Sequence, residues 1–203
     1  MKTGNRSRSL TLLGLLTAIL LVLSMTPLGY LNIGPLAISF NMIPVAVGAA
    51  ALGPVGGAIL GAVFGFTSFL QCLGIGGSSA MGVTLFGINP FLAFVQRFFP
   101  RLIAGFLVGV IYKSVRKNTE PGLAGGVAGC FAAFLNTVLF MSALVWLFGD
   151  TPYLQGLMEG RSAVAFIAAF VGVNAVIEIL ASTIVTAALC SALEKARLMG
   201  RKQ

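Results

Sequence analysis

The sequence predicts an all-α integral membrane protein, a bundle of six transmembrane helices with both termini in the cytoplasm. Three observations lead to this fold class. The composition is 58% hydrophobic and only 9% charged, with a mean hydropathy of +1.00, whereas soluble domains carry roughly 25% charged residues. Residues 9–96 contain no charged side chain at all. The basic residues gather at the ends of the apolar segments, where they orient a membrane protein.

Turn residues divide the apolar sequence into its elements, in chain order. A leucine-rich segment behind three basic residues exceeds the length of a secretory leader and stops at Pro27, so we expect a retained first helix. Gly53-Pro54 predicts a tight turn between the second and third helices. We expect loops at 28–35, 74–88 and 150–161. The predicted helices, in a single transmembrane substrate-binding domain over residues 1–203, are about 10–26, 36–52, 55–73, 91–112, 122–148 and 162–193.

Charge sets the expected orientation of this bundle. Three places share one side of a six-helix chain, namely the N-terminus, the segment after the fourth helix and the C-terminus. Together they hold ten of the 13 basic residues, whereas the opposite loops hold only Arg161. Cytoplasmic segments are enriched in Lys and Arg, so both termini are expected in the cytoplasm of a cell membrane that the chain crosses several times. The net charge of +8 is explained by this placement, and no nucleic-acid partner is expected.

Catalytic and metal-binding chemistry lacks the necessary residues. The chain has no histidine, five scattered acids and three cysteines that form no CxxC pair, so we expect no metal site. No GxxxxGK[ST], GxSxG or HExxH motif occurs, so the chain offers no site for ATP hydrolysis and no nucleophile–base pair. We therefore expect neither an enzyme nor a cofactor bound by this chain.

Polar side chains inside the apolar segments are the candidate functional residues, because charges deep in a bilayer are costly and usually mark function or a structural pair. Arg97 and Arg101 are four residues apart and face the same way. We expect Glu178 to form a structural ion pair with Arg101, which leaves Arg97 to bind an anionic ligand through its fork of donors. The alternative is that Arg97 extends outward to lipid headgroups. The predicted substrate-binding residues are Asn41, Asn89, Gln96, Arg97, Asn136 and Asn174, of which the last two could instead join helices.

A glycine at every fourth position marks the third predicted helix, from Gly53 to Gly65. Such a strip lets another backbone approach closely. It either packs against a helix of the same chain or, at Gly57 and Gly61, docks a different subunit. Gly14 and Ala18 form a shorter strip of the same kind on the first helix.

Several stretches resemble the substrate-binding S components of energy-coupling factor (ECF) vitamin transporters. They are residues 38–44 (ISFNMIP), 52–58 (LGPVGGA), 61–69 (GAVFGFTSF) and 97–105 (RFFPRLIAG). The resemblance implies a six-helix bundle with cytoplasmic termini and an outward-facing ligand cavity lined by the last three helices. It also implies a transmembrane coupling protein and two ATP-binding subunits as partners, which use the ATP. In that family small residues on the first helix dock the coupling protein, often as AxxxA, and here the matching place is the GxxxA of Gly14 and Ala18.

Within that family the pantothenate-type subunits resemble this chain most, through Pro-Leu-Gly-Tyr at 27–30 and Phe-Leu-Asn-Thr at 134–137. The expected function is therefore capture of a water-soluble vitamin, with pantothenate as the first candidate because its carboxylate suits Arg97. Two alternatives stay open. A self-sufficient facilitator would transport the ligand without partners, and a structural membrane subunit would bind no small molecule.

Overall fold

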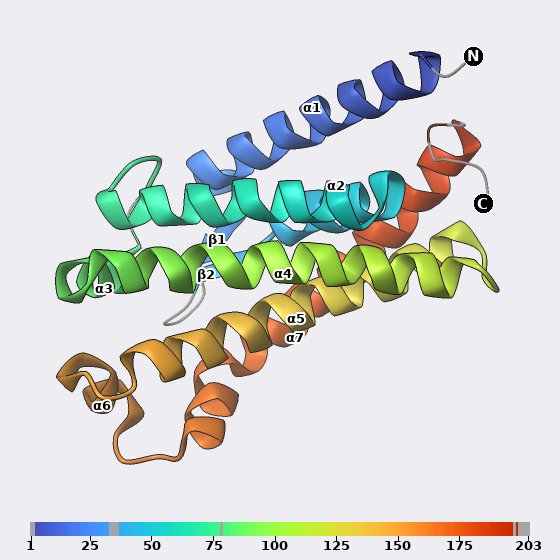
Figure 1. Ribbon diagram of the computed structural model, residues 1–203. Coiled ribbons are helices and arrows are strands. Elements are labelled where there is room, and N and C mark those ends of the chain that lie inside the picture. Colours follow the sequence, from blue (N-terminus) through green and yellow to red (C-terminus); the bar gives the residue numbers. More distant parts are fainter. Residues whose placement is uncertain (1–2, 33–36, 78, 197, 199–203) are drawn as a thin grey trace.

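The computed structural model describes residues 3–32, 37–77, 79–196 and 198. Within them the chain is nearly all helical, with long helices lying side by side and short elements at one end (Figure 1). The only strands described, β1 (Tyr30–Asn32) and β2 (Ala37–Ser39), form a small antiparallel sheet. The α-helices are α1 (Thr3–Met25), α2 (Met42–Leu70), α3 (Ala80–Ile88), α4 (Pro90–Arg116), α5 (Pro121–Phe148), α6 (Pro152–Met158) and α7 (Ala163–Lys195).

Five helical stretches of the described chain are long and apolar enough to cross a membrane. Each window has few charged residues and a mean hydropathy between 1.5 and 2.0. The fifth stretch covers the second part of α7, a helix that departs from helical geometry at Gly172 (φ 16°, ψ −111°). The stretches are Ser7–Met25, Met42–Leu73, Pro90–Arg116, Pro121–Phe148 and Ala175–Lys195.

The second of these stretches folds back on itself at Gly53. That residue has φ +79° and ψ −172°, a conformation that glycine adopts without steric penalty. A Cβ placed on Gly48 would collide with Leu60, although the two residues would lie about 18 Å apart along a straight helix. The turn predicted at Gly53-Pro54 is therefore present, and α2 consists of two antiparallel arms. The first arm spans only residues 42–52, because the sheet occupies the segment where the sequence predicted the start of this helix.

The glycine strip on the second arm of α2 packs against α4. A Cβ on Gly57 would collide with the carbonyl oxygen of Gly105, and one on Gly61 with that of Arg101. Both α2 glycines are buried by this contact. The strip thus lets two backbones of the same chain approach closely, as the first of the two alternatives predicted. The assignment of Gly57 and Gly61 to partner docking is corrected accordingly.

The start of α1, the turn between α4 and α5 and the end of α7 lie at the same end of the bundle (Figure 1). An ion pair between Arg116 and Glu194, with 2.8 Å between Nη2 and Oε1, joins the ends of α4 and α7 there. This matches the prediction that the three basic segments share one side. Lys2, Arg197, Arg201 and Lys202 of those segments lie outside the described residues.

The three segments predicted as loops contain short elements. β1 lies in the first, and β2 lies just beyond it, where the second helix was expected to begin. In the second, α3 begins after Ser79, whose Oγ accepts a hydrogen bond from the N–H of Gly82 at 3.2 Å. In the third, α6 begins after Thr151, with Pro152 at its first position. Such caps start helices too short for hydrophobic periodicity to reveal.

Two hydrophobic cores fill the bundle, one on each side of a polar stretch of α4. One core contains Val45, Leu60 and Ala104. The other contains Ala93 and Met141 and lies nearer α3 and α6. The candidate site lies on α4 between these two cores.

Candidate ligand-binding site

Three polar residues of α4 are buried between the two cores. Gln96 is fully buried, and Arg97 and Arg101 are 6% and 5% exposed. The two arginines are one helical turn apart, so their side chains leave the same face of α4. Two cations this deep in an apolar bundle require compensating contacts.

Arg97 points into the bundle. Its Nη1 donates to the Ser68 Oγ of α2 at 3.2 Å, and its Nη2 donates to the Ser79 Oγ at 3.1 Å. Ser79 is also the N-cap of α3. Arg97 thereby connects α2, α3 and α4, and its side chain is buried among them.

Arg101 is held by backbone oxygens and by aromatic rings. Its Nη1 donates to the carbonyl oxygen of Arg97 at 2.9 Å. Its Cζ lies 4.1 Å from the ring centroid of Phe140 on α5 and 5.3 Å from that of Phe64 on α2. Arg97 also lies over Phe140, at 5.3 Å. These distances are within the range of cation–π attraction, which stabilises a desolvated guanidinium.

Glu178 of α7 binds the chain at the end of the small sheet. Its Oε1 accepts a hydrogen bond from the backbone N–H of Ser39 at 2.5 Å. The ion pairs among the described side chains do not include one between Glu178 and Arg101. The predicted pair therefore stays a prediction.

Gln96 and Asn136 hold polar atoms that no described group satisfies. The Oε1 and Nε2 of Gln96 and the Oδ1 of Asn136 are buried and have no hydrogen-bond partner in the described chain. Leaving a buried polar group unsatisfied costs about 1–3 kcal/mol, and more than 90% of such groups in proteins are bonded. Asn136 lies one helical turn from Phe140 on α5, so both face α4. These amides are available to a ligand or to water.

Asn41 has its side-chain groups satisfied within the chain. Its Nδ2 donates to the Ser39 Oγ at 3.1 Å, and its Oδ1 accepts from the Ser24 Oγ at 3.2 Å. The residue is fully buried. These bonds fasten the start of α2 to α1, and no described contact brings Asn41 to the arginines.

Asn89 caps a helix, and the side chain of Asn174 is not described. The Oδ1 of Asn89 accepts a hydrogen bond from the N–H of Leu92 at 3.1 Å, which fixes the start of α4. Asn174 belongs to α7, but its side chain lies outside the described part of the chain. Of the six predicted substrate-binding residues, the structure therefore buries Gln96 and Arg97 on α4 and Asn136 on α5.

Four residues of this site were not predicted from the sequence: Phe64, Ser68, Ser79 and Phe140. Both serines accept hydrogen bonds from Arg97, and both rings lie against Arg101. The four-residue spacings from Asn136 to Phe140 and from Phe64 to Ser68 are the local signals that could have indicated shared helix faces. The other contacts depend on how separate helices meet.

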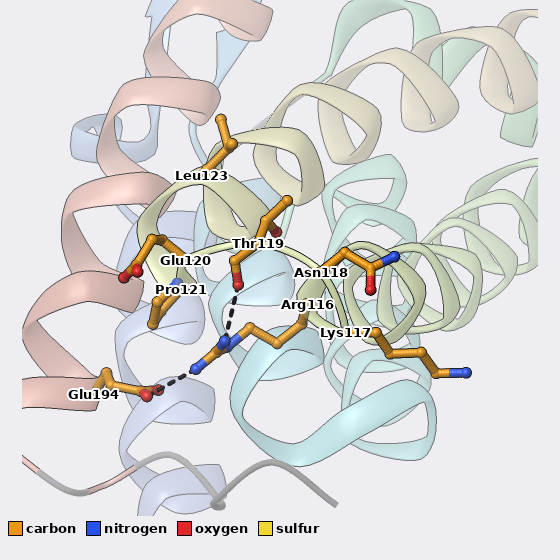
Figure 2. A pocket seen from close by; sticks show the side chains of 8 residues that line it. All are labelled: Arg116, Lys117, Asn118, Thr119, Glu120, Pro121, Leu123 and Glu194. Carbon is orange, nitrogen blue, oxygen red and sulfur yellow. Dashed lines mark hydrogen bonds and ion pairs between the residues drawn. The ribbon is translucent and has the colours of Figure 1, made fainter.

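A separate cavity of about 650 Å³ opens at the other end of α4, where α4, α5 and α7 meet. Figure 2 shows the guanidinium of Arg116 between Glu194 and the carbonyl oxygen of Thr119, with Lys117 directed away from them. Arg116 and Arg97 are 19 residues apart, or about 28 Å along the helix. The cavity is therefore distinct from the arginine site, and its lining mixes both signs of charge. The lining residues are Arg116, Lys117, Asn118, Thr119, Glu120, Pro121, Leu123 and Glu194.

Five apolar helical stretches around buried cationic and amide side chains define a multi-pass membrane protein with a polar interior. The chain belongs to the family described as ECF transporter, substrate-specific component, whose model matches residues 8–190. This confirms the resemblance found in the sequence. The family and the relatives described next are transporters, which agrees with the expectation that the chain is not an enzyme.

Two curated relatives are similar over nearly the whole chain. The pantothenic acid transporter PanT of Lactococcus lactis subsp. cremoris is 26% identical over 211 residues, which cover 95% of this chain and 97% of the relative. The pantothenate transporter PanT of Leuconostoc mesenteroides subsp. mesenteroides is 27% identical over 197 residues, 92% of each chain.

Proposed function

We propose that this chain captures pantothenate, or a closely similar water-soluble carboxylate, from outside the cell as the substrate-binding subunit of an ECF importer. The observation that carries the proposal is the buried site on α4, where two arginines accompany amide groups that no described residue satisfies. Family membership and the pantothenate transporters among the relatives support it.

The chemistry of the site suits such a ligand. A guanidinium binds a carboxylate through two parallel donors, and Arg97 presents its Nη atoms to neutral serine hydroxyls that a carboxylate could replace. Pantothenate also carries an amide and two hydroxyls. In this proposal Gln96 and Asn136 bind those groups, because each has buried polar atoms to offer. Asn41, Asn89 and Asn174 are left with structural or undescribed roles.

The proposed assembly follows the family. We infer that the chain crosses the cell membrane six times, with the two arms of α2 counted separately, and that both termini are cytoplasmic. A transmembrane coupling protein and two ATP-binding subunits are the proposed partners, and they supply the ATP-driven step. Gly14 and Ala18 are the proposed docking strip, since both are exposed on α1 and open space surrounds the Cα of Gly14.

The test is calorimetry of the purified chain in detergent against a panel of vitamins. We expect submicromolar binding of pantothenate and no comparable binding of riboflavin, folate or cobalamin. Gln96→Leu should weaken binding at least tenfold, whereas Gln155→Leu, which alters an exposed glutamine on α6, should leave it unchanged. A folded chain that binds none of the vitamins would refute the proposal.

The second candidate is a self-sufficient facilitator, and one observation favours it. α7 is broken at Gly172, and broken helices surround the substrate sites of many secondary transporters. Uptake of radiolabelled pantothenate into liposomes distinguishes the two functions. Uptake by this chain alone supports the facilitator, whereas uptake that requires the coupling protein, the ATP-binding subunits and ATP supports the importer.

A further inference from the structure

The aromatic ring of Phe140 on α5 contacts both buried arginines of α4. Its centroid lies 5.3 Å from the Cζ of Arg97 and 4.1 Å from that of Arg101. Neither the sequence motifs nor the comparisons assign this residue a role. The side chain is half-buried and follows Asn136 by one helical turn.

The two guanidiniums need such a group because they are like charges on one helix face. Both are buried, and repulsion between cations strengthens as the surrounding dielectric constant falls. The face of an aromatic ring carries negative electrostatic potential and attracts cations without itself being charged. A carboxylate in the same place would form an ion pair with a guanidinium, whereas a ring attracts both cations without adding an anion.

Other contacts hold the two arginines from α2, α3 and α4, and the ring of Phe140 adds a contact from α5. Arg97 is fixed from α2 and α3 by Ser68 and Ser79. Arg101 is fixed from its own helix by the carbonyl oxygen of Arg97 and from α2 by Phe64. Phe140 approaches from α5, the helix that also carries the unsatisfied Oδ1 of Asn136. The ring therefore sets the position of both cations relative to that amide.

We propose that Phe140 is a positioning residue that holds Arg97 and Arg101 as a paired cationic site and thereby makes the site prefer a carboxylate over its neutral analogue. This inference rests on the proposed function, since it takes the α4 site as the place where the vitamin binds. It goes beyond that function by assigning the anion preference to a residue that carries no charge.

The experiment measures the binding of two ligands by calorimetry to the full-length chain in detergent. Pantothenate carries the carboxylate, and pantothenol carries a primary alcohol in its place. The quantity of interest is the ratio of the two dissociation constants. We expect Phe140→Leu to reduce the preference for pantothenate by about fivefold, in line with the cation–π attraction of a partly buried ring, while binding of pantothenol changes by less than about twofold.

Three further variants separate electrostatics from shape. Phe140→Tyr keeps the ring face and should retain the preference. Replacement of Phe140 by pentafluorophenylalanine keeps the ring shape but removes the negative face, and should lower the preference as leucine does. It also keeps the test decisive if Phe140→Leu fails to fold. Phe134→Leu, on the same helix but 47% exposed, should change neither affinity.

The outcomes distinguish the inference from the function on which it rests. A wild-type chain that binds pantothenate, combined with fluorinated and leucine variants that keep the wild-type ratio, would overturn the inference alone. Equal weakening of both ligands would assign Phe140 a packing role and overturn it as well. A folded wild-type chain that binds neither ligand would overturn the proposed function together with the inference.

Discussion

A methyl group added at Gly61 is expected to destabilise the fold by separating α2 from α4. The Cβ of Gly61→Ala would collide with the carbonyl oxygen of Arg101, and it would lie 2.9 Å from that carbonyl carbon and 3.2 Å from the Cα of Leu102. All three are backbone atoms, which cannot rotate away as a side chain can. One of the two helices must shift to accept the new atom.

The loss of folding stability in Gly61→Ala is the difference between two opposing contributions. Overpacking a tight interface costs about 1–3 kcal/mol, and the upper half of that range applies because the collision is with backbone. Replacing glycine by alanine inside a helix contributes about 1 kcal/mol of stability. The expected net loss is therefore about 1–2 kcal/mol. The shift also moves Arg101, so we expect the affinity for pantothenate to fall as well.

Thermal unfolding in detergent checks this prediction, with Gly14→Ala as the matched control. Gly14 also lies within a helix, but nothing stands within 4 Å of a Cβ placed there. A loss of 1–2 kcal/mol corresponds to a Tm lowered by about 2–8 °C for a chain of this length, whereas the control should unfold at the same temperature or slightly higher. Equal Tm values for the two variants would refute the close packing of α2 on α4. An unchanged Tm with impaired subunit assembly would restore the docking role of Gly61.

Three further predictions concern the site, the partner surface and the end of the bundle. Arg97→Ala should weaken pantothenate binding more than tenfold in calorimetry, because it removes the donors proposed to hold the carboxylate. Gly14→Leu combined with Ala18→Leu should leave vitamin binding intact but reduce co-purification with the coupling protein, because bulky side chains block close helix approach. Arg116→Gln removes the ion pair with Glu194. The side chains of Arg116 and Glu194 are 16% and 41% exposed, so the free energy of unfolding should fall by no more than about 1 kcal/mol. The loss should shrink as salt is added, as measured by thermal unfolding.

Matched controls accompany these variants. Lys113→Ala removes an exposed cation of α4 and should keep the full affinity for pantothenate. An unaltered affinity for pantothenate in Arg97→Ala would contradict the role proposed for Arg97. Leu15→Phe enlarges an exposed residue of α1 next to Gly14. If this control lost as much co-purification with the coupling protein as the Gly14→Leu, Ala18→Leu variant, Gly14 and Ala18 would not form a specific docking strip. Arg161→Gln breaks the more exposed pair with Glu159 and should have a smaller effect than Arg116→Gln.

The helical fold could be predicted to a large extent from local sequence. Long uncharged segments indicated membrane-length helices because a bilayer requires about 20 apolar residues in a row, and the turn at Gly53-Pro54 was found where it was predicted. The small sheet, α3 and α6 were missed, because elements of three to nine residues leave little periodic signal. The break in α7 at Gly172 was also missed, since a single glycine inside an apolar segment is compatible with an unbroken helix.

The candidate site was predicted only in part. Gln96, Arg97 and Asn136 stood out as polar residues in apolar surroundings, and all three are buried. Asn89 stood out for the same reason, yet its role is to cap α4. An isolated sequence cannot separate these cases, because a polar side chain in a membrane helix is equally conspicuous whether it binds a ligand or a neighbouring backbone.

By itself the sequence determined the class of this protein. Its low charge, long apolar segments and distribution of basic residues are properties of composition and order, and the bilayer acts on them directly. Its motifs also indicated the ECF family, which the comparison confirmed. The tertiary structure alone decided which residues share a contact. In the tertiary structure the glycine strip packs against α4, and Ser68 and Ser79 accept hydrogen bonds from Arg97. The ring of Phe140 lies against the guanidiniums of both arginines. These contacts join residues 18 to 48 positions apart, and only the packing of separate helices brings such positions together.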